Sequence, residues 1–366
     1  MSEIEKKRIT FAALDPYIEQ NIILPTEKIV SGKKFVIWGD YNDYPRYLNE
    51  LYETVTTLRS VIDGCVDYAV GNAVVLNRQI GGFENGVVNR KGDNIEDVAR
   101  WCLRDYYLTG GFAVQVIRSQ SGAIAELYYI DIAHLRTDEH NEAFYYCPYF
   151  GLRYGRQNTI VYPRFVQDAR HEASIMYFKN NISRIYPIPQ YVASIKACEI
   201  ERCTDDFHLS AINNGFTGSY FINFNNGVPT DEVKEEIERD FNEKFSGSKN
   251  AGRIAFSWND TKENATTIDK VEVEDFGAKY ESLAKHCRQQ IFTAFRANPN
   301  LFGIPTESLG FSEEEYMSAF KLFNRTQIKP VQKKLIATFE KILGKGSITI
   351  VPFSLEEANE VTNPNM

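Results

Sequence analysis

Two short turn-rich stretches, Gly227-Val228-Pro229-Thr230 and Gly247-Ser248-Lys249-Asn250-Ala251-Gly252, enclose a single helical pattern near the middle of the chain. On either side, within residues 186–305, lies a long polar helical segment with a narrow apolar stripe. A narrow stripe is typical of a helix that packs on one neighbour. Two long helices around a small module predict a projecting stalk with a tip. This layout favours an assembly part over an enzyme pocket.

The enclosed module has the pattern of a β-α-β unit. Strand-like runs at Ser219–Asn225 and Arg253–Trp258 flank a helix predicted over Thr230–Ser246. Thr230 is a good N-cap, and Asp231 with Glu232 suits the positive end of the helix dipole. The apolar positions of this helix predict its buried face: Val233, Ile237, Phe241 and Phe245. A further strand-like run follows at Lys270–Val273.

The rest of the chain mixes helical and strand periods, which predicts an α+β fold. A charged arm with one strand near Lys34–Trp38 precedes one helix from Pro45 to Gly71 and a second helix capped by Asp93 or Asn94. After Gly110-Gly111 the pattern changes to strands. They are a hairpin formed by Phe112–Arg118 and Ile124–Ile132, then Ala143–Tyr149, Thr159–Val166 and Ala173–Phe178.

A long helix is also predicted near the end of the chain. Ser312 would cap it, and the helix continues to about Leu343 with Pro330 inside it. Because proline lacks an amide hydrogen and crowds the preceding turn, we expect a kink near Asn324–Gln327. A last strand, Ser347–Phe353, and an acidic polar tail follow.

The charge balance and the absence of known motifs argue against several functions. The 366 residues carry a net charge of −8, so no overall basic surface for gripping nucleic acid is expected. No apolar run is long enough to cross a bilayer, and the N-terminus is not signal-like, which predicts synthesis in a cytoplasm and no membrane partner. The six cysteines show no CxxC pair and are expected to be reduced.

No catalytic motif is found in the sequence. It lacks a P-loop, HExxH and GxSxG, and its five histidines are isolated. No cofactor or metal site is therefore predicted. Neighbouring acids such as Asp205-Asp206 could bind a metal, although such pairs are more often solvated charge. A metal-dependent nuclease or hydrolase, whose acids converge only in the fold, remains an alternative.

The order of several short segments resembles the portal (head–tail connector) proteins of tailed bacteriophages, over roughly residues 45–345. The matching segments are Leu58-Arg59-Ser60, Val70-Gly71-Asn72, Gly110-Gly111-Phe112, Leu127-Tyr128-Tyr129-Ile130-Asp131, Tyr186-Pro187-Ile188-Pro189-Gln190-Tyr191, Asn214-Gly215-Phe216, Gly247–Gly252 and Leu301-Phe302-Gly303-Ile304-Pro305. Each segment is common by itself, and their order is what is specific.

The resemblance implies a dodecameric ring at one capsid vertex, with a central channel for double-stranded DNA. It would divide the chain into an N-terminal arm 1–44, an α+β wing 45–186, stem helices 187–215 and 274–297, a clip 216–273, a tunnel loop 298–311, a kinked channel helix 312–345 and a C-terminal strand and tail 346–366, with the crown reduced or absent. The implied partners are the terminase large subunit, a head–tail adaptor and the major capsid protein. A non-portal adaptor or structural head protein is the alternative.

Two groups of side chains are candidate contacts under this resemblance. Those expected at the DNA channel are Asn298, Asn300, Thr306, Glu307, Ser308, Lys321, Arg325 and Lys329. Those expected to dock the motor are Glu235, Glu236, Glu238, Arg239, Glu243, Lys249 and Asn250. Together with Lys333, the three channel cations recur every fourth residue; they would face the channel or pair with acids of the adjacent subunit. For both groups the alternative is a solvated helix face.

Overall fold

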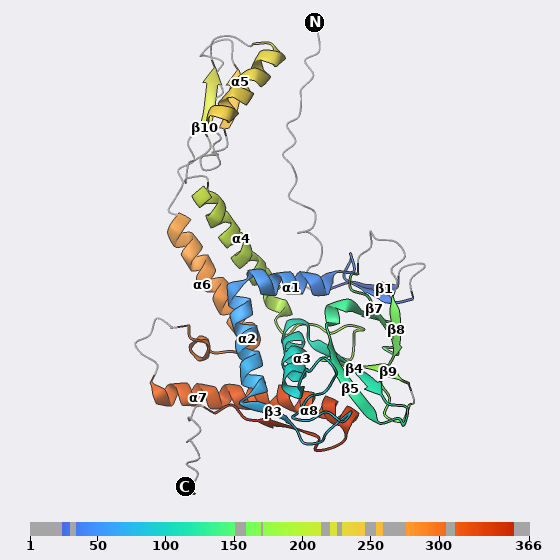
Figure 1. Ribbon diagram of the computed structural model, residues 1–366. Helices are drawn as coiled ribbons and strands as arrows, with labels where there is room; N and C mark the ends of the chain where they lie inside the picture. Colours follow the sequence, from blue (N-terminus) through green and yellow to red (C-terminus); the bar gives the residue numbers. More distant parts are fainter. Residues whose placement is uncertain are drawn as a thin grey trace, which may run out of the picture. The chain divides into compact units, whose positions relative to one another are not determined.

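The fold is that of a computed structural model, which describes residues 24–29, 34–150, 159–169, 171–213, 220–224, 229–245, 254–258, 276–304 and 312–354 (Figure 1). Its contacts divide the chain into two compact units, one of residues 1–198 and 290–366 and the other of residues 199–289. Both contain helices and strands, as the α+β prediction required. None of the described helices is long and apolar enough to cross a membrane.

The helix predicted from Pro45 to Gly71 is two helices, so that prediction is wrong in one respect. Helix α1 covers Tyr44–Thr54 and α2 covers Thr56–Val70, separated by Val55 in an extended conformation (φ −101°, ψ 104°). Val55 is buried with 1% of its surface exposed. It lies in a run of β-branched residues, which lose side-chain freedom in a helix. Burial of Val55 in an extended conformation therefore ends α1.

Helix α3, Ile95–Thr109, begins and ends as its sequence predicts. Asn94 accepts a hydrogen bond from the Asp97 amide in a capping box, and Gly110 ends the helix at φ 90°. A Cβ atom on Gly110 would lie 2.1 Å from the carbonyl oxygen of Ile188. Both the left-handed backbone and this close approach require glycine here.

Two three-stranded antiparallel sheets follow α3, and all five strands predicted in this region are present (Figure 1). In the first sheet β4 is central, and in the second β7 is central. The strands of the first are β4 Gly111–Arg118, β5 Ile124–Ile130 and β9 Ala173–Lys179, and those of the second are β6 Leu135–Thr137, β7 Ala143–Tyr146 and β8 Ile160–Pro163. A 3-10 turn, η2 (Ile132–His134), joins the two sheets.

Two further strand pairs join distant parts of the chain. Strand β1, Glu27–Ile29, pairs with β2, Val36–Trp38, and β3, Ala73–Leu76, pairs with β12, Ile348–Val351. The sequence predicted β2 and β12 but neither partner, because a run of three or four residues gives too little alternation to recognise.

The second unit contains the predicted β-α-β module. After η3 (Val192–Ser194) and α4 (Ile195–Asn213) come β10 (Tyr220–Phe224), α5 (Asp231–Phe245), β11 (Ile254–Trp258) and α6 (Phe276–Phe295). Strands β10 and β11 pair in parallel, which requires a crossover such as α5 between them. Val233, in the first turn of α5, was predicted to be buried, and this prediction is wrong because 41% of its surface is exposed. The run Lys270–Val273 lies outside the described residues.

The long helix near the C-terminus is interrupted where the sequence predicts it. Helix α7 covers Glu313–Phe323 and begins with a capping box between Ser312 and Glu315. A π-helical turn, η6 (Asn324–Ile328), joins it to α8, Lys329–Leu343. Pro330 lies at the start of α8, and the wider i→i+5 turn before it accommodates the missing amide hydrogen.

Candidate functional site

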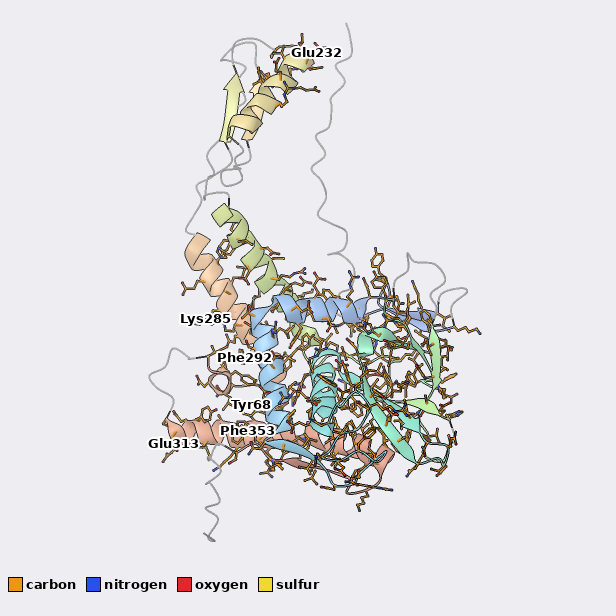
Figure 2. The ribbon with its side chains drawn as sticks, in the orientation of Figure 1. Tyr68, Glu232, Lys285, Phe292, Glu313 and Phe353 are labelled. Carbon is orange, nitrogen blue, oxygen red and sulfur yellow. The ribbon has the colours of Figure 1, made fainter. Side chains whose placement is uncertain are left out.

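Six aromatic rings from five segments pack together beside α2, and Figure 2 labels three of these residues, Tyr68, Phe292 and Phe353. Tyr68 of α2 lies at the centre, with ring centroids 5.0 to 6.0 Å from four other rings. The members of this aromatic cluster are Tyr68, Phe292 of α6, Phe302 of η5 (Pro299–Phe302), Phe320 and Phe323 of α7, and Phe353 after β12. The cluster fixes the residues before 305 and those after 311 to the same surface of α2.

A polar contact and a close approach add to this anchor. The Tyr68 hydroxyl donates a hydrogen bond of 2.8 Å to the Leu301 carbonyl oxygen, and burial raises the pKa of Tyr68, which keeps the donor protonated. One turn earlier in α2, Gly64 faces Phe302. A Cβ atom at Gly64 would lie 2.6 Å from two carbons of that ring. The residues before 305 therefore lie against bare helix backbone.

The predicted channel-loop residues fall partly within the described chain. Asn298 and Asn300 are both half-buried, and the Asn298 side chain accepts a hydrogen bond of 3.0 Å from the Asn300 amide. That contact begins η5, so the Asn298 oxygen has a structural role. Thr306, Glu307 and Ser308 lie outside the described residues, and their contact with DNA stays a prediction.

Four cations of the last long helix form one exposed group, called here the basic row. Its members are Lys321, Arg325, Lys329 and Lys333, all exposed. Within the described parts of the chain, none of them has an acidic partner. Their neighbour Lys334 differs, since its ammonium group donates to the Tyr106 hydroxyl at 2.8 Å. The basic row is thus available to a partner outside the subunit.

The acids predicted to dock the motor lie on α5. Glu235, Glu236 and Arg239 are exposed there. Glu238 and Glu243 belong to the same helix, but their side chains, like Lys249 and Asn250, lie outside what is described. Lys234 pairs with Asp231 at 2.8 Å, and no other ion pair of α5 is found among the described side chains. The exposed charged side chains described on α5 are therefore mostly acidic, with Arg239 among them.

The described residues contain no constellation suited to catalysis. No group of three His, Cys, Asp or Glu side chains among them could hold a metal ion, and the six cysteines form no disulfide with one another. The buried carboxyl of Asp105 has its pKa raised by burial and by Asp131. It accepts hydrogen bonds from the Tyr129 hydroxyl at 3.0 Å and the Ile132 amide at 3.2 Å. These contacts join α3 to η2, which is a structural role.

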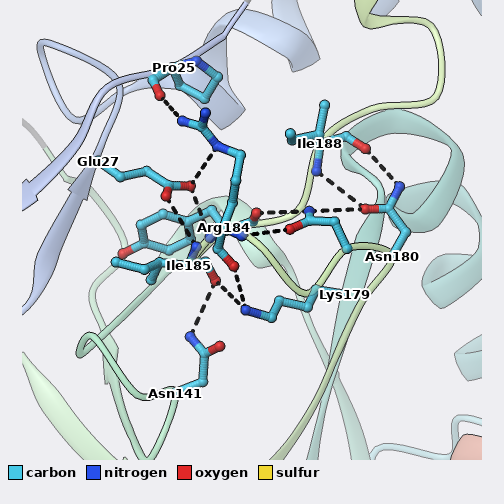
Figure 3. Close-up of polar contacts among 10 residues, drawn as sticks. Pro25, Glu27, Asn141, Lys179, Asn180, Arg184, Ile185 and Ile188 are labelled. Carbon is cyan, nitrogen blue, oxygen red and sulfur yellow. Dashed lines mark hydrogen bonds and ion pairs between the residues drawn. The ribbon is translucent and has the colours of Figure 1, made fainter.

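Sequence reasoning missed a polar junction between the N-terminal arm and the segment that leads to α4 (Figure 3). The Glu27 carboxylate accepts hydrogen bonds of 3.1 Å from the amides of Ile185 and Tyr186, and it pairs with Arg184 at 3.3 Å. The Arg184 guanidinium also donates to the Pro25 carbonyl. One charged residue on a three-residue strand and one on a loop give no periodic signal, so no pattern could have revealed this pairing.

A buried arginine was also missed. Arg136 of β6 is 2% exposed. It donates to Asn42 Oδ1 at 2.5 Å, to the Asn42 carbonyl at 2.6 Å and to the Leu135 carbonyl at 2.6 Å. Its guanidinium lies 4.4 Å from the centre of the Phe150 ring, and burial lowers its pKa to about 10. It holds residues before α1 against the second sheet.

Comparison with known proteins identifies the family. The sequence model of the phage portal protein family matches residues 91–358, well over half of the chain. This chain belongs to the phage portal protein family. Membership of this structural family agrees with the prediction that the portal protein is no enzyme. No curated protein matches the chain.

Three solved structures resemble this portal protein. A chain in the neck of an empty gene transfer agent (GTA) particle, computed with C6 symmetry, is 15% identical with a TM-score of 0.52, covering 87% of this chain and 85% of that one. A chain in the neck of the native GTA particle, computed with C12 symmetry, is 16% identical with a TM-score of 0.50. That match covers 87% of this chain and 86% of the other. An HK97 family phage portal protein from Corynebacterium diphtheriae is 10% identical with a TM-score of 0.49. That match covers 80% of this chain and 89% of the other. At such identities the two GTA matches establish the fold alone.

Proposed function

We propose that this portal protein forms a ring at one capsid vertex, through which double-stranded DNA is packaged and ejected. Its family membership over residues 91–358 carries the proposal. A similar fold in a GTA neck computed with C12 symmetry supports twelve subunits. The wing, stem, clip, tunnel-loop and channel-helix boundaries given by the resemblance are part of this proposal.

The charge of the chain suits passage of DNA without sequence specificity. A ring of twelve subunits would carry about twelve times the net charge of −8. Many phosphate contacts would release counterions and hold the duplex tightly. A mostly acidic ring would not bind the duplex so tightly. ATP hydrolysis would be carried out by a separate terminase motor.

Assembly is the direct test of this function. Negative-stain microscopy and native mass measurement of the purified chain should give rings with a central hole. A stable monomer at micromolar concentration would count against a portal ring.

The exposed acids of α5 provide a second test, of the docking partner. We assign the terminase large subunit, and later the head–tail adaptor, to this face because its exposed charges are mostly acidic. Replacement of Glu235 and Glu236 by lysine should weaken motor binding at least tenfold in a pull-down with purified terminase. The same change at two exposed wing acids, Glu53 and Glu139, is the matched control. If intact rings of the lysine variant bind the motor as well as the wild type does, α5 is not part of the docking surface.

A further inference from the structure

The middle of the last long helix is basic, although the chain as a whole is acidic. Between Glu315 and Glu340 the sequence has five cations and no acid, whereas the whole chain has a net charge of −8. One cation, Lys334, is engaged by Tyr106. The other four form the basic row, and all four are exposed. A concentration of unpaired like charge on one helix costs electrostatic repulsion unless a partner neutralises it.

The π-helical turn η6 aligns the basic row. In an uninterrupted α-helix, side chains four apart drift by about 40° per step, so the four cations would spread over roughly 120°. A π-helical turn takes up one additional residue, which removes about 100° of that drift. Because η6 lies between Lys321 and Lys329, the row becomes nearly straight over about 17 Å.

An exposed leucine lies beside the row. Leu322 is 65% exposed, the most exposed large apolar residue of the described part of α7 and α8. Phosphate groups bind cations but make no favourable contact with an apolar side chain. Protein interfaces, in contrast, combine an apolar centre with a polar rim. The combination of Leu322 with the basic row therefore favours a protein partner over DNA.

The same helix supplies a complementary surface. Glu313 and Glu314 in the first turn of α7 are exposed, and Figure 2 shows Glu313 at the free start of the helix. Within the described chain neither has a cationic partner, and Glu315 rather than either of them closes the capping box. Every copy thus has an acidic start followed by a basic row along one helix.

We propose that the basic row with Leu322 docks a second copy of this chain, whose Glu313 and Glu314 lie against it. Such a contact joins two different surfaces, and a heterologous contact of this kind closes into a ring when its rotation permits. This inference rests on the proposed ring and assigns one of its subunit contacts.

Charge reversal and its compensation test the pairing. Arg325→Glu with Lys329→Glu should lower the fraction of subunits in rings at least tenfold in 150 mM salt, by native mass measurement. Glu313→Gln with Glu314→Gln should act in the same direction. The four-site swap, which adds Glu313→Lys and Glu314→Lys to the reversed row, should restore rings. Lys28→Glu with Lys345→Glu, an equal charge change at exposed sites outside the row, should leave rings unchanged.

Other outcomes overturn the inference in distinguishable ways. If the wild-type chain forms no ring, the proposed function itself fails. If the wild type and the variant with the reversed row form rings equally well, the row is not a subunit contact. Loss of linear duplex DNA binding by the rings of that variant would then show that the row contacts DNA. Unchanged DNA binding would show that the row is solvated. If the swap fails to restore rings while its circular dichroism and unfolding match those of the wild type, Glu313 and Glu314 are not the partners.

Discussion

Substitution of Gly64 by alanine sets two effects of opposite sign against each other. Gly64 lies inside α2, where alanine is favoured over glycine by about 1 kcal/mol of helix propensity. The added methyl group, however, would lie 2.6 Å from two carbons of the Phe302 ring. Overpacking of this kind costs about 1–3 kcal/mol. The ring also contacts Tyr68, Phe292 and Phe323, so it cannot move without losing those contacts.

We therefore expect Gly64→Ala to lower the free energy of unfolding by about 1 kcal/mol, since the clash exceeds the propensity gain. In a Phe302→Leu background the clash is relieved. There the same substitution should raise the free energy of unfolding by up to about 1 kcal/mol. The sign reversal corresponds to a coupling of roughly 2 kcal/mol between the two positions, within the range of contacting residues.

Urea unfolding followed by tryptophan fluorescence measures both changes. Protein concentration must be held constant, because assembly adds to apparent stability. Ser60→Ala, an exposed site on the same helix, is the control and should act equally in both backgrounds. If Gly64→Ala stabilises the wild-type chain, or if the two substitutions are additive, Phe302 does not pack on Gly64 and the reasoning on the aromatic cluster is refuted.

Three other predictions follow from buried polar contacts. Arg136→Met leaves the carbonyl oxygens of Asn42 and Leu135 without their donor and should cost about 3 kcal/mol in urea unfolding; a loss below about 1 kcal/mol would contradict these contacts. Glu27→Gln weakens the charged acceptor of the Ile185 and Tyr186 amides, so those amides should exchange at least tenfold faster with deuterium, with amides of β4 unchanged. Burial, together with a hydrogen bond to Asp63, raises the pKa of Tyr52 to about 12. The stability it contributes is thus complete below pH 10 and lost as pH rises towards 12, and Tyr52→Phe should flatten the unfolding profile in that window.

Local signals in the sequence predicted several element ends. Asn94 and Ser312 accept the capping hydrogen bonds that their spacing indicates, and Gly110 has the left-handed conformation expected after a helix. Pro330 placed the irregular turn within a residue or so. Each of these features depends on neighbours within a few residues, which is the range that a single sequence reveals.

Features that depend on distant residues were not predictable in the same way. Val55 breaks a helical pattern because of burial, and the Glu27–Arg184 pair joins residues 157 positions apart. The basic row was visible as a four-residue period, but its alignment depends on η6, which the sequence indicated only as a kink. The aromatic cluster gave no signal, since its rings come from five separate segments.

The pairing of β3 with β12 has a consequence for how the chain folds during synthesis. The register joins Ala73 to Val351, and the unit that contains both strands is interrupted by residues 199–289. Contacts so distant in sequence form late and slowly. On the ribosome the first unit cannot be completed until Val351 has emerged, whereas β10, α5 and β11 come from one short stretch. Premature termination would thus leave an exposed β3 edge, a surface prone to pairing with other chains.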